Sequence, residues 1–191
     1  MCSESKINTL YPYKPKEFGI PFEKILNGPR EREVKIHSGG GNLLSCYITD
    51  RSLEITDPLL KEFGLTAVVN KSGLASFTIT TETPSQGKHI DMFASHFVKL
   101  ALTYFEQQGN KIHCCKGNWK GDSISLKQFW SKKRKTKNNI IAAQNTWSGK
   151  LFRKLGFTQI SEDDVIIQPN KEVIAYFRKP SEKQIKTDTT T

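Results

Sequence analysis

The 191-residue sequence lacks the long hydrophobic runs that membrane insertion requires. Nowhere do eighteen apolar residues follow one another, and the N-terminus has no apolar run behind a basic segment. A membrane-spanning helix needs about twenty such residues, and a secretory signal peptide needs about ten. We therefore expect a cytoplasmic protein, and export by a route that uses no leader peptide is the alternative.

Cysteine is also scarce, and its spacing is uninformative. The four cysteines, Cys2, Cys46, Cys114 and Cys115, show no C-x-x-C pattern. Neighbouring cysteines on a strand point to opposite faces, which is poor geometry for sharing one metal ion. A chain of this length can bury a core that is stable without disulfides. The sequence therefore predicts buried thiols and no metal site.

The local signatures of common catalytic sites are missing as well. The glycine run at residues 39–41 is not followed by Lys-Ser or Lys-Thr, so it is not a phosphate-binding P-loop. None of the four histidines lies in a local Ser-His-Asp or Cys-His signature, and no internal repeat is present. Evidence for function must come from charge and from the order of structural elements.

Acidic residues are nearly absent from residues 116–154, which hold eleven Lys or Arg and one acid, Asp122. Because the whole chain has a net charge of +10, the remainder sums to zero. Such an excess attracts a coenzyme with a phosphorylated ribose, a nucleic acid or an anionic membrane. A solvated loop that maintains solubility is the alternative. The excess is densest at five residues: Lys132, Lys133, Arg134, Lys135 and Lys137.

The pattern along the chain predicts an irregular N-terminal arm followed by alternating strands and helices. The arm is residues 1–42, with four of the eight prolines. Residues 57–64 resemble a short helix, with Asp57 as N-cap and Gly64 as its end. Apolar residues repeat at three and four in residues 90–108, which predicts a longer helix. A hairpin is predicted at residues 66–70 and 74–82, strands at 43–50, 111–115, 158–160, 165–168 and 172–179, a helix at 140–155, and a flexible tail at 180–191.

Residues 145–157, NTWSGKLFRKLGF, are the most specific stretch. Their spacing is helical, Gly156 is placed for a left-handed C-cap, and Phe157 would turn back into the core. The stretch resembles the late helix of the GNAT (GCN5-related) N-acetyltransferases. Asn145 takes the family's Asn position, Ser148 its small Ala position, and residues 154–157 match its Lys-Leu-Gly-Phe close.

This resemblance implies an α/β fold with a GNAT-like mixed, mostly antiparallel sheet flanked by helices. It covers residues 66–179 in element order, from the hairpin through the long helix to the final strand. It implies a single domain at residues 43–179. Residues 116–139 would be a basic insertion, because the family usually has only a few residues between the strand and the helix at this point.

The resemblance also implies a coenzyme A site in the loop before the long helix. The family places Gln or Arg, any two residues, Gly, one residue and then Gly or Ala, and the two small residues let backbone N–H groups approach the pyrophosphate. Aligned with that pattern, Gln86, Gly87 and Lys88 fit, and Asn145 would lie near the cofactor. His89 and Asp91 replace the two small residues, and Asp91 is also explained as an acid of the helix's first turn.

The catalytic residues depart from the family. Phe152 stands where the family frequently carries the tyrosine that protonates the departing thiolate, and phenylalanine has no proton to donate. Glu82, at the strand end where the family often has its general base, and His89, with a near-neutral pKa, are the candidate catalytic residues.

Two functions follow from these observations. One is a divergent N-acyltransferase that moves an acetyl or acyl group from acetyl-CoA or acyl-CoA to an amine-bearing acceptor. The other is a catalytically degenerate GNAT-fold binding module, or a toxin or effector component, that engages nucleic acid or another polyanion through the insertion. There, Trp119, Phe129 and Trp130 either stack on bases or anchor the insertion to the core.

Overall fold

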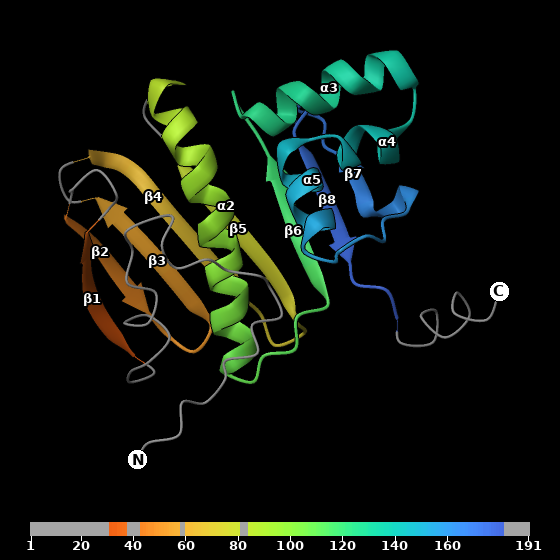
Figure 1. The fold of residues 1–191 in the computed structure, drawn as a ribbon. Helices are drawn as coiled ribbons and strands as arrows, with labels where there is room; N and C mark the ends of the chain where they lie inside the picture. Colours follow the sequence, from red (N-terminus) through yellow and green to blue (C-terminus); the bar gives the residue numbers. More distant parts are fainter. Residues whose placement is uncertain (1–30, 38–42, 58–59, 81–83, 182–191) are drawn as a thin grey trace. The chain divides into compact units, whose positions relative to one another are not determined.

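A computed structural model describes residues 31–37, 43–57, 60–80 and 84–181. By its internal contacts the chain divides into two compact units. Figure 1 shows their helices and strands in colours that follow the sequence. The first unit comprises Met1–Ala67 and Thr78–Asn110, and the second comprises Val68–Phe77 and Lys111–Thr191. Each unit therefore combines segments that are separated in sequence.

The strands pair in the order β1-β2-β3-β4-β5-β6-β8-β7. β5 and β6 pair in parallel, whereas β1–β2, β2–β3, β6–β8 and β7–β8 are antiparallel. The predicted class, α/β with a mixed and mostly antiparallel sheet, is therefore confirmed. The strands are β1 (Arg32–His37), β2 (Leu43–Ile48), β3 (Ser52–Asp57), β4 (Leu60–Val69), β5 (Leu74–Thr80), β6 (Cys114–Trp119), β7 (Val165–Ile167) and β8 (Val173–Arg178).

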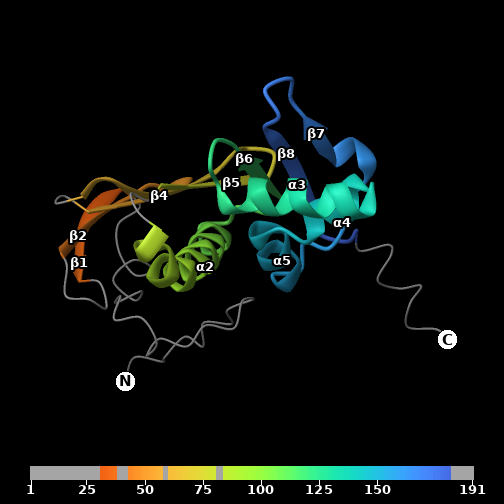
Figure 2. The same cartoon turned by 90° about the horizontal axis from the view of Figure 1, so that it is seen from above.

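The first unit packs the helix α2 (Pro84–Gln107) on one face of its strands, as Figure 2 shows. Alternate residues of the strands are fully buried, including Cys46, Ile48, Leu53 and Ile55. On α2 the buried residues recur at three and four from Ala94 to Ala101, as in an amphipathic helix, whereas every residue from Leu100 to Phe105 is buried. The buried residues of α2 are Ala94, Phe97, Val98, Leu100, Ala101, Leu102, Thr103, Tyr104 and Phe105.

The second unit places β6 between β5 and β8 and packs helices against one face of these strands. The helices are α3 (Ile124–Thr136), α4 (Asn139–Gln144) and α5 (Trp147–Lys154). Trp119 of β6 lies 5.8 Å from Phe129 of α3, and Phe177 of β8 lies 5.5 Å from Phe152 of α5, between ring centroids. Residues of β6 and β8 alternate between buried and more exposed positions, because successive side chains point to opposite faces.

Several predictions for the first half of the chain are wrong. Residues 60–64 lie in β4 and residues 52–57 form β3, so the predicted helix at 57–64 does not form. Residues 32–37 of the predicted arm form β1, which pairs with β2 from Arg32↔Ile48 to His37↔Leu43. At Asp57 and Gly64 strand pairing overrides the local capping signals, and residues 32–37 contain none of the prolines that predict the arm. Residues 1–30 of the arm lie outside the described residues.

The second half agrees better with the sequence, with shifted boundaries. The predicted strand at 111–115 starts later, at Cys114, and runs to Trp119, so residues 116–119 belong to the sheet rather than to an insertion. The predicted helix at 140–155 is interrupted at Asn145 and Thr146. The strand predicted at 158–160 is only an isolated bridge, Gln159↔Arg178. The β4–β5 hairpin, α2, β7 and β8 are confirmed.

Candidate functional site

The stretch that carries the family resemblance forms the junction between α4 and α5. Asn145 caps the end of α4, and its Nδ2 donates a hydrogen bond of 2.8 Å to the Ile141 carbonyl oxygen. Thr146, which is fully buried, caps the start of α5. Its hydroxyl accepts from the Gly149 N–H at 2.9 Å and donates to the Ala143 carbonyl at 2.8 Å. The local sequence therefore ends α4 and starts α5 with side chains that hydrogen-bond to backbone groups at both helix ends.

The end of α5 has the geometry that the sequence predicts. Gly156 adopts a φ of +90°, and its N–H donates to the Arg153 carbonyl at 3.1 Å. The N–H of Phe157 donates to the Phe152 carbonyl at 3.0 Å, and the Phe157 side chain is fully buried. These contacts match a left-handed C-cap with an inward hydrophobic residue, so this prediction is confirmed.

Phe152 occupies a wholly apolar environment in α5. It is 2% exposed, and its ring lies 5.9 Å from Phe77 and 5.5 Å from Phe177, between centroids. The side chain thus packs β5, β8 and α5 together. It holds no group that could donate a proton at this position.

Ser148, at the family's small position, belongs to a buried polar network. The Trp119 indole Nε1 donates to the Ser148 hydroxyl at 2.7 Å, and the Ser125 and Ser148 hydroxyls lie 3.2 Å apart. Gly117 leaves room for this indole, because a Cβ there would lie 2.8 Å from Trp119 Nε1. The sequence alone did not reveal this network, since its members are distant along the chain.

The residues predicted for coenzyme binding lie in α2 rather than in a loop. α2 begins at Pro84, a residue suited to the first helical position, so residues 84–91 are helical. Asp91 therefore lies beyond the first turn and is not the first-turn acid, and the first turn contains no acid. The side chains of Gln86, Lys88 and His89, and all of Glu82, lie outside the described residues. Gln86, Gly87, Lys88 and His89 belong to the first unit and Asn145 to the second.

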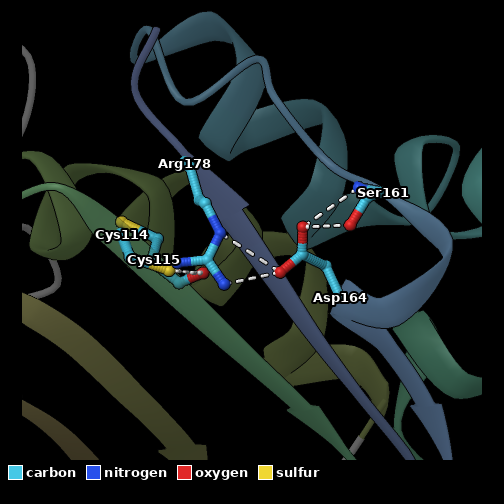
Figure 3. Close-up of polar contacts among 5 residues, drawn as sticks. All are labelled: Cys114, Cys115, Ser161, Asp164 and Arg178. Atoms are coloured by element: carbon cyan, nitrogen blue, oxygen red, sulfur yellow. Dashed lines mark hydrogen bonds and ion pairs between the residues drawn. The ribbon is translucent and has the colours of Figure 1, made fainter. Parts of the chain in front are cut away.

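A second polar cluster, shown in Figure 3, joins the turn before β7 to β8. The Arg178 guanidinium donates to Asp164 Oδ1 from Nη2 at 2.6 Å and from Nε at 3.2 Å. Asp164 Oδ2 accepts from the Ser161 N–H at 3.0 Å and from its hydroxyl at 2.8 Å. Burial raises the pKa of Asp164, but the hydrogen bonds from Arg178 and Ser161 outweigh burial and lower the pKa below its ordinary value.

Cys114 lies beside Arg178 in Figure 3 and is a buried free thiol. Burial raises the pKa of Cys114, although Arg178 opposes the effect. Cys46 and Cys115 are also buried, as predicted, and Cys2 lies outside the described residues. A thiol with a raised pKa is protonated near neutral pH and is a weak nucleophile, so Cys114 is a structural residue.

The densest basic residues lie at the end of α3. Lys133, Arg134 and Lys135 form its last turn, and Lys137 is its C-cap with a φ of +58°. Arg134, Lys135 and Lys137 are exposed, and Lys132 and Lys133 are partly exposed. The predicted insertion is thus a folded helix whose charged end faces solvent.

The described part of the chain contains no group of three or more His, Cys, Asp or Glu residues placed to hold a metal ion. None of the helices in that part combines the length and apolar character needed to cross a bilayer. Comparison of the chain with protein-family models, curated proteins and solved structures gave no match.

Proposed function

We propose that this protein is a divergent GNAT-like N-acyltransferase that transfers an acetyl or acyl group from a coenzyme A thioester to an amine. The order of elements from β4 to β8 carries the proposal. A hairpin, a long helix, a strand, the capped helix α5 and two final strands occur in the order that the resemblance implies, with α3 and α4 as additional helices between β6 and α5. The helix α5 ends with the Gly-Phe close on which the resemblance rests.

The first turn of α2 is suited to the pyrophosphate. The N–H groups of Ser85 and Gln86 have no carbonyl partner one turn earlier in the helix, and Pro84 has no N–H. A long helix without a first-turn acid presents these donors and the positive end of its dipole to an anion. Because His89 and Asp91 lie further along the helix, they do not occupy the position expected from the loop alignment.

In this proposal the protein positions the thioester next to the amine and supplies one group that accepts a proton from the amine. Bound acyl-coenzyme A would supply the activated acyl group. Phe152 cannot protonate the departing thiolate, so that proton comes from solvent. Glu82 and His89 remain the candidates to remove a proton from the attacking amine.

Acetyl-CoA binding tests the proposal by thermal shift. The melting temperature should rise with ligand concentration, by the equivalent of about 2.7 kcal/mol at a hundred times the Kd. Gln86→Glu places a negative charge in the first turn of α2 and should weaken binding several-fold. Gln107→Glu makes the same charge change at the other end of α2 and should leave binding unchanged. No shift at millimolar acetyl-CoA would refute the proposal.

A further inference from the structure

We propose that the C-terminal end of α3 binds a nucleic-acid strand through its phosphates, without reading the bases. We call this basic surface the α3 end, and it consists of Lys132, Lys133, Arg134, Lys135 and Lys137. The inference does not rest on acyl transfer. It follows from the charges, the exposure and the side-chain contacts of this helix.

The charges of the α3 end are not neutralised by neighbouring acids. Across the described ranges, Lys132, Arg134, Lys135 and Lys137 form no ion pair, whereas Lys127 earlier in α3 pairs with Asp122 at 3.2 Å. Lys133 lies over the Trp130 ring, 5.2 Å from its centroid. The start of the helix thus has a lysine that pairs with an acid, whereas the positive charges at its end have no acidic partner among the described residues.

Stabilisation of the helix does not require so many cations. A helix C-terminus carries about half a negative elementary charge, which one or two cations compensate. The α3 end carries five positive charges. Like charges three or four residues apart destabilise a helix, so the cluster weakens the fold where it lies. A polyanionic partner would relieve this repulsion.

Two of the three aromatic residues of this segment are buried, and the third, Trp130, is partly exposed but held in place by its contacts. Trp119 is 3% exposed and Phe129 is fully buried. Trp130 packs edge-on against Phe129 at 5.3 Å, and its Nε1 donates to the Lys171 carbonyl at 3.1 Å. The aromatics therefore anchor α3 to the unit, and binding would depend on phosphates rather than on base identity.

The same contacts favour nucleic acid over a membrane. A helix that inserts into a bilayer interface needs a free apolar face beside its basic face. The apolar side chain of Phe129 is buried, and the large exposed apolar residue of α3, Ile124, lies at the opposite end of the helix from the basic cluster. After the cluster, Ile141 of α4 is 41% exposed, and one such side chain does not make the apolar face that insertion requires.

A matched pair of triple variants of the full chain tests this inference. Lys132→Gln/Arg134→Gln/Lys135→Gln removes three charges from the α3 end and keeps good helix formers. Lys71→Gln/Lys111→Gln/Lys120→Gln removes three exposed charges of the same unit that lie outside the α3 end. Fluorescence anisotropy with a labelled 20-nucleotide single-stranded RNA of mixed sequence is measured across a series of NaCl concentrations.

We expect the wild-type protein to bind this RNA with an affinity that falls steeply as salt increases. The α3 triple should weaken binding on the order of 100-fold at 0.1 M salt and reduce the salt slope by about 2, since each contact contributes about 0.7 to the slope. The control triple should weaken it much less. Thermal melts and acetyl-CoA shifts of both variants separate a loss of folding or of coenzyme binding from a loss of RNA binding.

Three results would overturn the inference. The first is no RNA binding by the folded wild-type protein at low salt. The second is equal weakening by the two triples, because binding would then reflect net charge alone. The third is binding to vesicles containing phosphatidylserine without binding to RNA, which would assign the α3 end to a membrane surface.

Discussion

At the scale of single residues, Asp164 holds the turn before β7 to β8. Its side chain is 10% exposed and accepts from Arg178 and Ser161 on its two oxygens. Asp164→Asn keeps the shape and removes the charge, so the Arg178 and Ser161 donors lose a charged acceptor. We expect a loss of about 1–2 kcal/mol in the free energy of unfolding, a modest figure because the Arg178 side chain is 53% exposed. Urea unfolding at pH 7 measures it.

The same pair predicts a pH dependence. The folded pKa of Asp164 is lowered, so its contribution to stability is fully present above the unfolded pKa of about 3.9 and is lost as the pH falls through the folded pKa. The difference in stability between wild type and Asp164→Asn should therefore shrink as the pH is lowered below about 4. A difference that stays constant from pH 7 to pH 3 would contradict the lowered pKa.

Cys46 should resist thiol reagents in the folded protein. It is fully buried, and burial raises its pKa to about 12 although Arg32 opposes the effect. Burial therefore keeps the reagent away from the Cys46 thiol, and the raised pKa keeps the reactive thiolate scarce. Iodoacetamide at pH 8, followed by peptide mass mapping, should leave Cys46 unmodified in native protein and modified in urea. If Cys46 were labelled as fast in native protein as in urea, the result would show that β2 opens readily.

Some residue roles could be predicted from sequence and others could not. The Gly156 cap and the inward Phe157 follow from local backbone rules, which act over a few residues. The Trp119–Ser148 hydrogen bond and the Asp164–Arg178 pair depend on the register of distant strands. No local pattern encodes such a register. The candidate catalytic residues Glu82 and His89 remain predictions.

At the scale of elements, Gly149 lies where α5 packs against α4, and Gly156 lies where α5 ends. Substituting each by Ala compares the cost of disturbing helix packing with the cost of disturbing a helix end. A Cβ at Gly149 would lie 2.2 Å from the Ala143 carbonyl oxygen and 2.9 Å from Thr146 Oγ1, so Gly149→Ala should separate α4 from α5. A Cβ at Gly156 would meet nothing within 4 Å, so Gly156→Ala should cost only the backbone strain of a positive φ, about 1 kcal/mol. We expect Gly149→Ala to cost about 3 kcal/mol or more.

Chemical denaturation of the two variants provides the comparison, since each adds a single methyl group to the same stretch. Equal losses would show that α4 and α5 adjust freely at their junction. If Gly149→Ala does not fold, circular dichroism of the soluble fraction still ranks it below Gly156→Ala.

Elements were predictable where the local signal and the tertiary contacts agreed. The β4–β5 hairpin, α2 and β8 have strong periodicity and clear turn residues, and all three form. Residues 60–64 carry helix-like capping signals but lie in β4. The sequence of α3 predicts a charged insertion rather than a packed helix, because lysines interrupt its helical spacing and its buried residues, Ser125 and Phe129, are few.

At the scale of the whole molecule, the net charge of +10 should make stability depend on salt. Repulsion among like charges destabilises the compact state, and salt shortens the Debye length from about 30 Å at 0.01 M to about 8 Å at 0.15 M. The melting temperature should therefore rise between these concentrations. The variant Lys132→Gln/Arg134→Gln/Lys135→Gln should show a smaller rise, and an equal or larger rise would mean that the repulsion lies elsewhere.

The hydrogen bonds at Gly73 have a consequence for how the second unit folds. The Gly73 carbonyl accepts from the N–H groups of His113 and Cys114, at 3.0 and 3.4 Å, across about 40 residues of sequence. β6 then pairs on its other side with β8, the last strand of the chain. Each pairing closes a long loop, whose entropy must be lost before the contact is gained. During synthesis β6 therefore has a partner on only one side until residue 178 emerges, and completion of this unit should be a late and slow folding step.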